Sequence, residues 1–245
     1  TRITFKPDLK NFFHMNELEE DIIGLMKRRV IDMAACTGKT VNVYLNDKKI
    51  NCATLDKYVN YYFEDKVEKL YSQSSNGNWE VCVVVNPEVK FQQMSFVNGI
   101  HTVNGGQHVD AVCKHINRKI LNVIKKKGYK RKKDIKISGE NLKNNMFIFL
   151  RSMIVNPSFK GQIKEILTTA SKDFGSKYEM KDKEVEKLMK TSLVDRAIKM
   201  SDMKKELNLG TVNDKKRRTN YLRIPKLDDA NKAGTKDSLK CTLML

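Results

Sequence analysis

Two polar residues in the second half of the chain have the types and spacing to bind a phosphate group. Gln162 and Lys164 lie two positions apart in a polar segment that follows Asn156 and Pro157. Residues two apart in an extended loop point to the same side, so the amide and the ammonium would face one ligand together. The ammonium neutralises charge on a terminal phosphate, and the amide donates a neutral hydrogen bond to it. The pair therefore suits the end of a nucleotide, and a solvated polar loop is the alternative interpretation.

A dense run of cations forms a second constellation between residues 125 and 136. Eight basic residues and one acid fall within these twelve positions. The basic residues are Lys125, Lys126, Lys127, Lys130, Arg131, Lys132, Lys133 and Lys136. A flexible basic loop of this kind neutralises the backbone phosphates of a nucleic acid without reading its bases. The sequence therefore predicts a nucleic-acid contact here, with a solvated charged loop as the alternative.

The overall composition favours a polyanionic partner. The 245 residues are 40% apolar, which is enough for a core, and carry a formal net charge of +18. A globular protein this basic usually meets nucleic acid, or less often an anionic membrane surface. No apolar run approaches the length of a membrane span and no signal peptide is visible, so nucleic acid is the favoured partner.

Other residues capable of chemistry carry weaker signals. The odd number of cysteines and the absence of a CxxC pair predict free buried thiols in a reducing compartment. His101, His108 and His115 have no Cys or acidic partners at ligand spacing, so we expect packing or surface roles and no metal site. Gly105-Gly106 predicts a turn into a helix, because no complete phosphate-loop motif accompanies it. Asp228-Asp229 are expected to be turn and cap residues of a linker.

The elements that must position these residues follow from periodicity. Alternation and β-branched content predict strands at 1–5, 41–45, 48–52, 79–85, 91–98 and 146–154. Helical spacing of apolar residues predicts helices at 16–33, 55–67, 108–123 and 185–207. We expect 79–85 and 91–98 to pair as antiparallel strands. Strands and helices interleave without strict βαβ alternation, so the predicted class is α+β.

The segment from Asn156 to Glu165 resembles a loop of the eukaryotic-type type IIA DNA topoisomerases, viral members included. The family loop usually reads Asn-Pro-x-Phe-x-x-Gln-Thr-Lys-Glu, and a lysine in it reaches from the transducer domain into the ATP site. The resemblance implies that Lys164 senses the γ-phosphate and that Gln162 and Ile163 lie beside it. Ile163 departs from the usual threonine, so this chain has no hydroxyl to offer at that position.

Three further motifs occur in the order of that family. Residues 96–110 are similar to the transducer signature, and 224–231 with 233–234 are similar to the segment before the metal-binding TOPRIM domain. Residues 3–8 resemble the last strand region of the ATPase domain, where Thr1 would match a threonine near the adenine. The first residue is not Met and the last five are apolar, so we expect a piece of a longer protein.

The resemblance implies a domain order. Residues 1–53 correspond to the C-terminal part of a GHKL (Bergerat) ATPase domain. Residues 54–220 correspond to an α+β transducer like ribosomal protein S5 domain 2, a sheet backed by helices. Residues 221–245 correspond to the linker into TOPRIM and its first strand.

The same resemblance implies a function. The intact enzyme would be an ATP-dependent isomerase that passes one DNA duplex through a transient double-strand break in another. This chain would couple hydrolysis to domain movement and contact duplex DNA through Lys125–Lys127 and the cations after them. ATP and Mg²⁺ would bind mainly outside the chain, which alone would be inactive. We expect a homodimer, in the nucleus for a cellular enzyme and in host cytoplasm or virion for a viral one.

Two other functional classes stay open from the sequence. A non-enzymatic nucleic-acid-binding module would use the basic run but would need nothing from Lys164. A small-molecule phosphotransferase of the same fold would need a phosphate-binding glycine loop, and none is visible.

Overall fold

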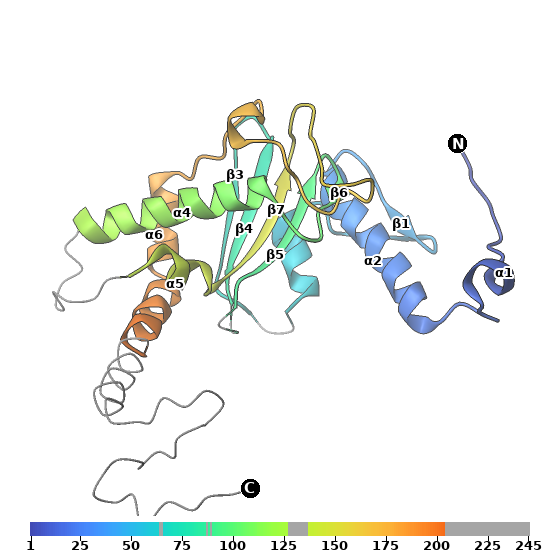
Figure 1. Ribbon diagram of the computed structural model, residues 1–245, viewed down its shortest axis with the longest axis horizontal. Coiled ribbons are helices and arrows are strands. Elements are labelled where there is room, and N and C mark those ends of the chain that lie inside the picture. Colours follow the sequence, from blue (N-terminus) through green and yellow to red (C-terminus); the bar gives the residue numbers. More distant parts are fainter. Residues whose placement is uncertain (64–65, 87, 89, 127–136, 204–245) are drawn as a thin grey trace, which may run out of the picture.

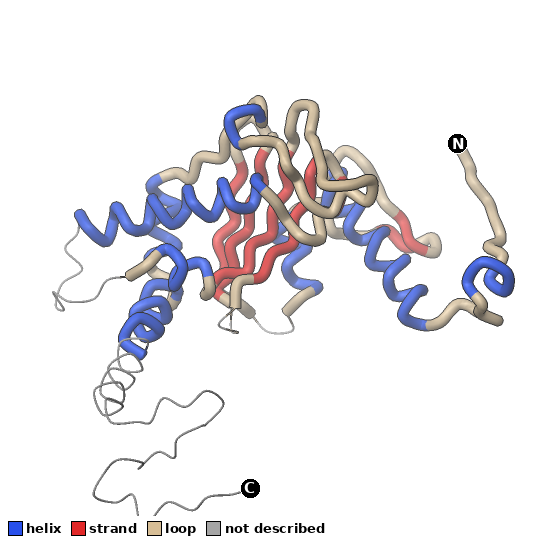
Figure 2. Tube along the Cα trace, viewed as in Figure 1, coloured by secondary structure: helices blue, strands red, loops and turns tan. Residues whose placement is uncertain are grey.

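A five-stranded mixed sheet organises the chain, as shown in a computed structural model that describes residues 1–63, 66–86, 88, 90–126 and 137–203. The strand order is β3-β4-β7-β5-β6. The strands are β3 (Lys69–Gln73), β4 (Trp79–Val85), β5 (Gln92–Val97), β6 (Ile100–His101) and β7 (Met146–Ser152). All neighbours pair antiparallel except β5 and β7, which are parallel, so the last long strand lies inside the sheet (Figures 1 and 2).

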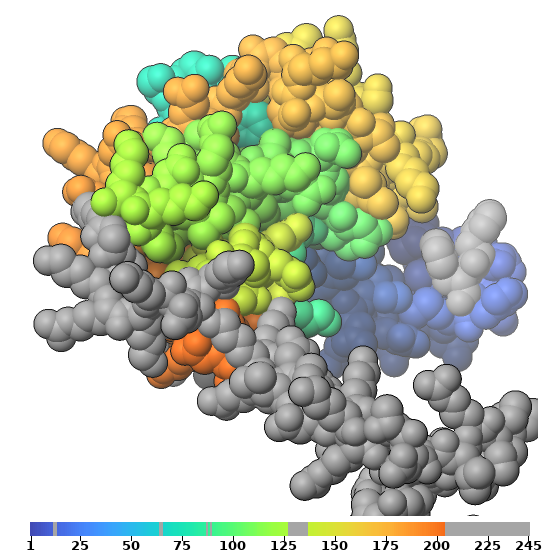
Figure 3. Space-filling model, turned by 60° about the vertical axis from the view of Figure 1, so that its left-hand side comes forward, coloured from blue at the N-terminus to red at the C-terminus, as the bar shows by residue number. Residues whose placement is uncertain are grey.

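One face of the sheet is covered by α4 (Gln107–Lys126), a 20-residue helix. Val109, Val112, Ile116 and Ile120 form its buried stripe, with the spacing expected for one side of a helix. The short α5 (Gly139–Lys143), α6 (Asp182–Met189) and the helical residues 193–203 complete this layer. The outer side of α4 stays exposed, with residues of the 155–200 region packed around it (Figure 3).

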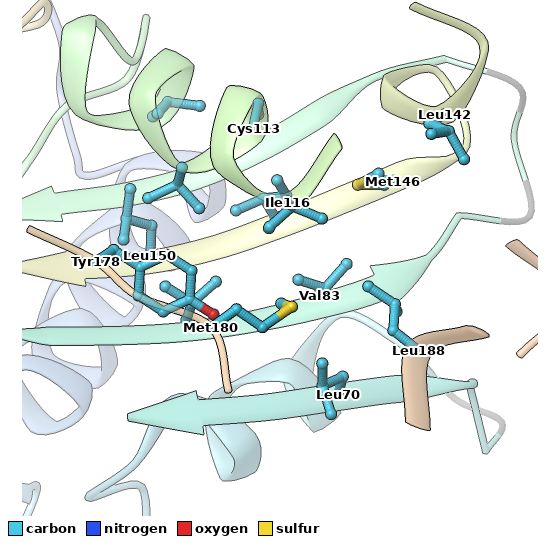
Figure 4. Close-up of a cluster of buried hydrophobic side chains, with 14 of the residues drawn as sticks. Leu70, Val83, Cys113, Ile116, Leu142, Met146, Leu150, Tyr178, Met180 and Leu188 are labelled. Atoms are coloured by element: carbon cyan, nitrogen blue, oxygen red, sulfur yellow. The ribbon is translucent and has the colours of Figure 1, made fainter. Parts of the chain in front are cut away.

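The core under α4 is built from alternate residues of the central strands. Val81, Val83, Ile148 and Leu150 face this layer, and their neighbours Cys82 and Phe149 face the opposite one. Ile116 and Cys113 of α4 point onto the strands, with Leu188 of α6 beside Leu70 (Figure 4). A strand buried on both faces needs apolar or paired residues at every position, which explains the unbroken apolar run from Val81 to Val85 in β4.

The second face is covered by α2 (Glu20–Thr37), α3 (Leu55–Tyr58) and the 3-10 turn η1 (Val59–Tyr61). Ala34 and Ala35 of α2 and Tyr58 of α3 pack on Phe96 and Phe149 of the sheet. A hairpin of β1 (Tyr44–Leu45) and β2 (Lys48–Lys49) follows α2. Its turn residues, at 46 and 47, both have positive φ, as expected for a type I′ turn.

A buried ion pair joins this second layer to the sheet. Arg151 Nη2 of β7 lies 2.8 Å from Glu80 Oε2 of β4, and both side chains are largely buried. Glu80 also accepts hydrogen bonds from the Leu55 amide (2.8 Å) and the Tyr71 hydroxyl (2.9 Å), while Arg151 donates to the carbonyl of Cys36 (2.9 Å). The ends of α2 and α3 are therefore fixed on two adjacent strands through one charged pair.

Several predicted elements are confirmed and others are wrong. The strand at 79–85 is present with the predicted bounds. The helices at 16–33 and 108–123, the short hairpin near residue 46 and the strands at 91–98 and 146–154 are present with shifted ends. Residues 1–5 form no strand, because no described strand lies alongside them; a short helix, α1 (Leu9–Phe13), follows instead. The expected pairing of 79–85 with 91–98 is also wrong, because β7 inserts between them.

One helix prediction was too long, one predicted helix is interrupted, and several short elements were missed. The predicted helix at 55–67 ends near residue 61, and β3, absent from the prediction, starts at Lys69. The predicted helix at 185–207 is interrupted at 190–192, where the Ser192 amide and hydroxyl both donate to the Glu68 carboxylate instead of continuing the helix. The short β6 and α5 were also missed. Residues 204–245, with the predicted TOPRIM linker and Asp228-Asp229, lie outside the described residues.

A close backbone contact joins the start of α4 to the loop after β7. The Leu167 amide donates to the Gly105 carbonyl (3.0 Å), and the Gln107 amide donates to the Leu167 carbonyl (3.1 Å). Gly106 has φ +131°, and a Cβ there would lie 2.6 Å from the Leu167 nitrogen and also against its carbonyl oxygen. Only glycine fits this approach. The predicted turn at Gly105-Gly106 is thus confirmed and also forms a docking site for residues 165–168.

None of the described helices is long and apolar enough to cross a membrane.

Substitution of Gly106 by Ala should detach this loop from α4. We expect a loss of about 2–4 kcal/mol in the free energy of unfolding, because strain at positive φ adds to overlap with a rigid backbone. Amides of residues 158–168 should also exchange with solvent faster. Gly77→Ala is the matched control: it also has positive φ but meets nothing within 4 Å, so it should cost only about 1 kcal/mol. Equal effects of the two substitutions in urea unfolding would contradict the docking role.

Acid should destabilise the fold through buried His108. Burial lowers the pKa of His108 from 6.5 to about 4. As pH falls from 6.5 towards 4, the unfolded chain binds a proton at this imidazole that the folded chain does not, so stability is lost across that window, by up to about 3 kcal/mol. Urea unfolding at several pH values should show a shallower acid slope for His108→Gln than for the parent chain. Parallel slopes would mean that His108 is not the group responsible.

Candidate functional site

The polar loop after β7 folds back on itself as a narrow hairpin. Phe159 and Leu167 form an antiparallel bridge, and the Lys160 amide donates to the Ile166 carbonyl (2.9 Å). At the base of the hairpin, the Ser158 carbonyl accepts from both the amide (2.9 Å) and the hydroxyl (3.0 Å) of Thr168. The limb at 165–167 is the one held against α4, so the tip projects from an anchored base.

The tip, residues 161–164, carries the predicted phosphate-binding side chains. Gln162, Ile163 and Lys164 are all exposed, Ile163 to 81%. The expectation of an extended loop is wrong here: the four residues form a tight turn, in which Gly161 and Lys164 both have positive φ. Alternation therefore does not set the direction of Gln162 and Lys164. Lys164 has φ +62°, uncommon for a residue with a Cβ, and its Nζ lies 5.9 Å from the centre of the Phe159 ring.

The carboxylate next to Lys164 is held by another group. Glu165 Oε2 accepts a hydrogen bond from the Asn104 side-chain amide (3.1 Å), and the Glu165 carbonyl accepts from the Asn104 backbone amide (3.1 Å). Within the described part of the chain, Lys164 enters no ion pair. Its ammonium is thus available to an external anion, which is the property that a terminal phosphate requires.

Thr1 is not brought to this tip. It lies at the end of an extended, exposed segment that stands apart from the sheet (Figure 1). The predicted contact of Thr1 near an adenine stays a prediction.

The predicted basic loop begins where α4 ends. Lys125 and Lys126 form the last turn of that helix and are exposed. Cations at a helix C-terminus are stabilised by the helix dipole, so their position does not require a ligand. The other predicted DNA-binding residues, Lys127, Lys130, Arg131, Lys132 and Lys133, lie outside the described residues.

The three histidines considered in the sequence analysis all have protein partners. His108 Nε2 lies 3.2 Å from Thr102 Oγ1, and His101 Nδ1 lies 3.0 Å from Arg29 Nη1. His115 Nε2 accepts from the Met180 amide at 3.2 Å. Groups of three or more His, Cys, Asp or Glu able to hold a metal do not occur among the described residues.

Four of the cysteines lie in the described part, and all four are free thiols, as predicted. Cys52, Cys82 and Cys113 are buried, and burial raises the pKa of Cys82 to about 12. These thiols therefore stay protonated at neutral pH and pack as small apolar groups.

Asn104 and the close approach at Gly106 are the positioning elements that the sequence analysis missed. Gly105-Gly106 was assigned only to a helix-entry turn. A second consecutive glycine is a signal for close approach of another backbone, but it does not say which segment approaches. Asn104 gives no local signal, because its partner Glu165 is 61 residues away.

Comparison with known proteins places this architecture in a family. A protein-family model described as DNA gyrase B matches residues 44–216. DNA topoisomerase 2 of Saccharomyces cerevisiae is 41% identical over an alignment that covers the whole chain and 18% of that protein. The curated relatives are much longer, and the chain spans only 17–18% of the length of two of them.

Solved structures agree with this assignment. The ATPase region of S. cerevisiae topoisomerase II superposes with a TM-score of 0.70 at 40% identity, covering 81% of this chain and 49% of that one. The ATPase and transducer domains of DNA topoisomerase II from Balamuthia mandrillaris superpose with a TM-score of 0.72 at 32% identity, covering 82% and 49%. The chain therefore belongs to the DNA gyrase B family of type IIA DNA topoisomerases, and along its whole length it is similar to the eukaryotic DNA topoisomerase 2 proteins.

Proposed function

We propose that this chain is the transducer part of an ATP-dependent type II DNA topoisomerase, which passes one duplex through a double-strand break in another. The observation that carries the proposal is the exposed, unpaired Lys164 on a hairpin tip that is anchored to the base of α4. The relatives, whose structures are described as ATPase regions and as ATPase and transducer domains, support the same role.

The hairpin tip fits one end of an ATP site. Lys164 offers a positive charge and Gln162 an amide donor, both exposed, while Asn104 holds the carboxylate of Glu165. ATP bound there would supply the terminal phosphate that these two side chains hold. The remaining parts of an ATP site, and a site for Mg²⁺, are not assigned to the described residues.

The proposed domain division follows the family order: 1–53 as the end of the ATPase domain, 54–220 as the transducer and 221–245 as the approach to TOPRIM. Ala34 and Ala35, from the first part, pack in one core with Tyr58, Phe96 and Phe149 of the second. Movement of one part would therefore be passed to the other through direct packing. In the intact enzyme we propose a homodimer that acts on duplex DNA, nuclear for a cellular enzyme and in host cytoplasm or virion for a viral one.

The mechanism proposed for these residues is mechanical. Lys164 and Gln162 hold the terminal phosphate while it is present and release it when it leaves. The hairpin limb at 165–167 shares backbone hydrogen bonds with the start of α4. Displacement of the tip would therefore also displace that helix. Lys125 and Lys126 lie at the other end of the same helix, where they meet backbone phosphates.

Lys164→Ala in the intact enzyme should lower DNA-stimulated ATP turnover by about tenfold to a hundredfold, because a charge aimed at the phosphoryl group is lost. Strand passage should fall with it, and nucleotide binding should fall less. Lys160→Ala is the matched control: it removes the same charge from the same hairpin, one residue before the turn, and should change turnover by less than about twofold. Unchanged ATP turnover in Lys164→Ala would refute the sensing role.

Replacement of Lys125, Lys126, Lys127 and Lys130 together by Ala should weaken binding of duplex DNA and reduce its dependence on salt. Each lost phosphate contact lowers the slope of log K against log salt by about 0.9. The control replaces four exposed lysines elsewhere, Lys27, Lys39, Lys48 and Lys49, so that net charge is matched. If both variants bind with the salt slope of the parent enzyme, the basic run is a solvated loop.

A further inference from the structure

The outer side of α4 carries a stripe of cations that leads away from the predicted DNA-binding loop. Lys114, Arg118 and Lys125 are four and seven residues apart, which places them on one side of a helix. All three are exposed, on the side opposite the buried stripe of Val112 and Ile116. From 114 to 125 the stripe runs about 16 Å along the helix axis.

Two acids on and beside α4 pair with cations outside the stripe. Asp110 is the one acidic residue in the sequence of α4, and it pairs with Lys143 (3.2 Å). Asp182 forms an ion pair with Lys119 (2.9 Å), which is not part of the stripe. Lys114, Arg118 and Lys125 make no ion pair with any described residue.

The far end of the stripe opens into a cleft of about 300 Å³ between α4 and residues 171–178. Lys114 and Arg118 line one wall, and Lys177 lines the other. The second wall is fixed in place, because Trp79 Nε1 donates to Ser176 Oγ (2.8 Å) and the Trp79 ring packs against Phe174. Three cations from two separate segments thus converge on one opening.

Among the described residues, Arg118 finds no hydrogen-bond acceptor. Its one described contact is Nη2 to His115 Nδ1 at 3.2 Å. The Met180 amide donates to the other ring nitrogen, Nε2, so in the neutral ring Nδ1 carries the proton. Burial and the charges of Arg118 and Lys119 lower the pKa of His115, while Glu179 opposes them, and the ring is therefore neutral at pH 7. Arg118 then faces another donor, which leaves its guanidinium open to an external anion.

We propose that Lys114, Arg118 and Lys177 form a second phosphate-contacting surface for duplex DNA, continuous along α4 with the basic loop at Lys125. This inference rests on the proposed function and extends it. The spacing favours a polymer: over about 16 Å one strand of a duplex advances by about five phosphates, so the stripe can follow one backbone. The ring faces of Trp79 and Phe174 are buried, so a stacked small ligand finds no platform in the cleft.

The test compares three triple variants of the intact enzyme in binding a duplex of about 30 base pairs over a range of salt. The first changes Lys114, Arg118 and Lys177 to Ala. The second changes Lys125, Lys126 and Lys127 to Ala. The third, a charge-matched control, changes Lys27, Lys48 and Lys49 to Ala.

The cleft variant should bind DNA about tenfold or more weakly at 0.1 M salt, with the slope of log K against log salt reduced by about two to three, whatever the base sequence. A charge-keeping version, Lys114→Arg, Arg118→Lys and Lys177→Arg, should restore most of the affinity, which a purely structural role would not do. Loss in the loop variant alone, with the cleft variant equal to the control, would overturn this inference and leave the proposed function standing. Unchanged DNA affinity in both the cleft variant and the loop variant would contradict this inference and also the DNA contact in the proposed function.

A second experiment tests whether the ligand of the cleft is DNA or a small anion. Inorganic phosphate and ATP are titrated against the enzyme and the cleft variant without DNA. We expect no binding that depends on Lys114, Arg118 and Lys177. Saturable micromolar binding lost in the cleft variant would identify a small-anion site and overturn the DNA surface.

Discussion

The backbone of Gly106 lies so close to that of Leu167 that no side chain fits between them. The positions of both candidate sites depend on this contact. On one side the contact anchors the hairpin whose tip carries Gln162 and Lys164. On the other side it fixes the first turn of α4, the helix that ends at Lys125 and Lys126. Backbone hydrogen bonds are short and directional, so a displacement at the hairpin base cannot be absorbed by side-chain rearrangement. One rigid junction thus lies between the tip that we propose to sense phosphate and the helix that we propose to contact DNA.

The sheet supplies the support that makes this junction rigid. Strand β7 lies between β4 and β5, is buried on both faces and leads directly into the hairpin. The buried pair of Glu80 and Arg151 fixes α2 and α3 on its other face. Removing one partner would leave a buried charge uncompensated, which typically costs about 3–5 kcal/mol. In the proposed mechanism, motion of the N-terminal helices would reach β7 through this ion pair and the close packing around it.

Local sequence patterns predicted most helices and strands, whereas the strand order and the contacts around the site depend on residues far apart in the sequence. The apolar run at 81–85 predicts a strand and the stripe at 109, 112, 116 and 120 predicts a helix, without knowledge of what packs against either. The order of the strands could not follow from them, because β7 enters the sheet between two strands that precede it by some fifty residues or more. Lys164 and Gln162 were proposed from residue type and family motif, and their phosphate-binding role stays a prediction. The tight turn that carries them was not predicted. The sequence analysis assumed an extended loop, whereas Gly161 and Lys164 both have positive φ. The role of Asn104 could not be predicted either, because its partner Glu165 lies far along the chain.

Coupling between the two sites is the property that most directly tests this arrangement. The affinity of the intact enzyme for duplex DNA is measured with and without a non-hydrolysable ATP analogue, in the parent enzyme and in Lys164→Ala. Coupling through the junction predicts that the analogue changes DNA affinity several-fold in the parent enzyme, in the range of about 5–150-fold typical of allosteric effects. In Lys164→Ala the DNA affinity without nucleotide should be unchanged and the effect of the analogue should largely vanish. An equal nucleotide effect in both enzymes, at saturating analogue, would contradict a sensing role for Lys164.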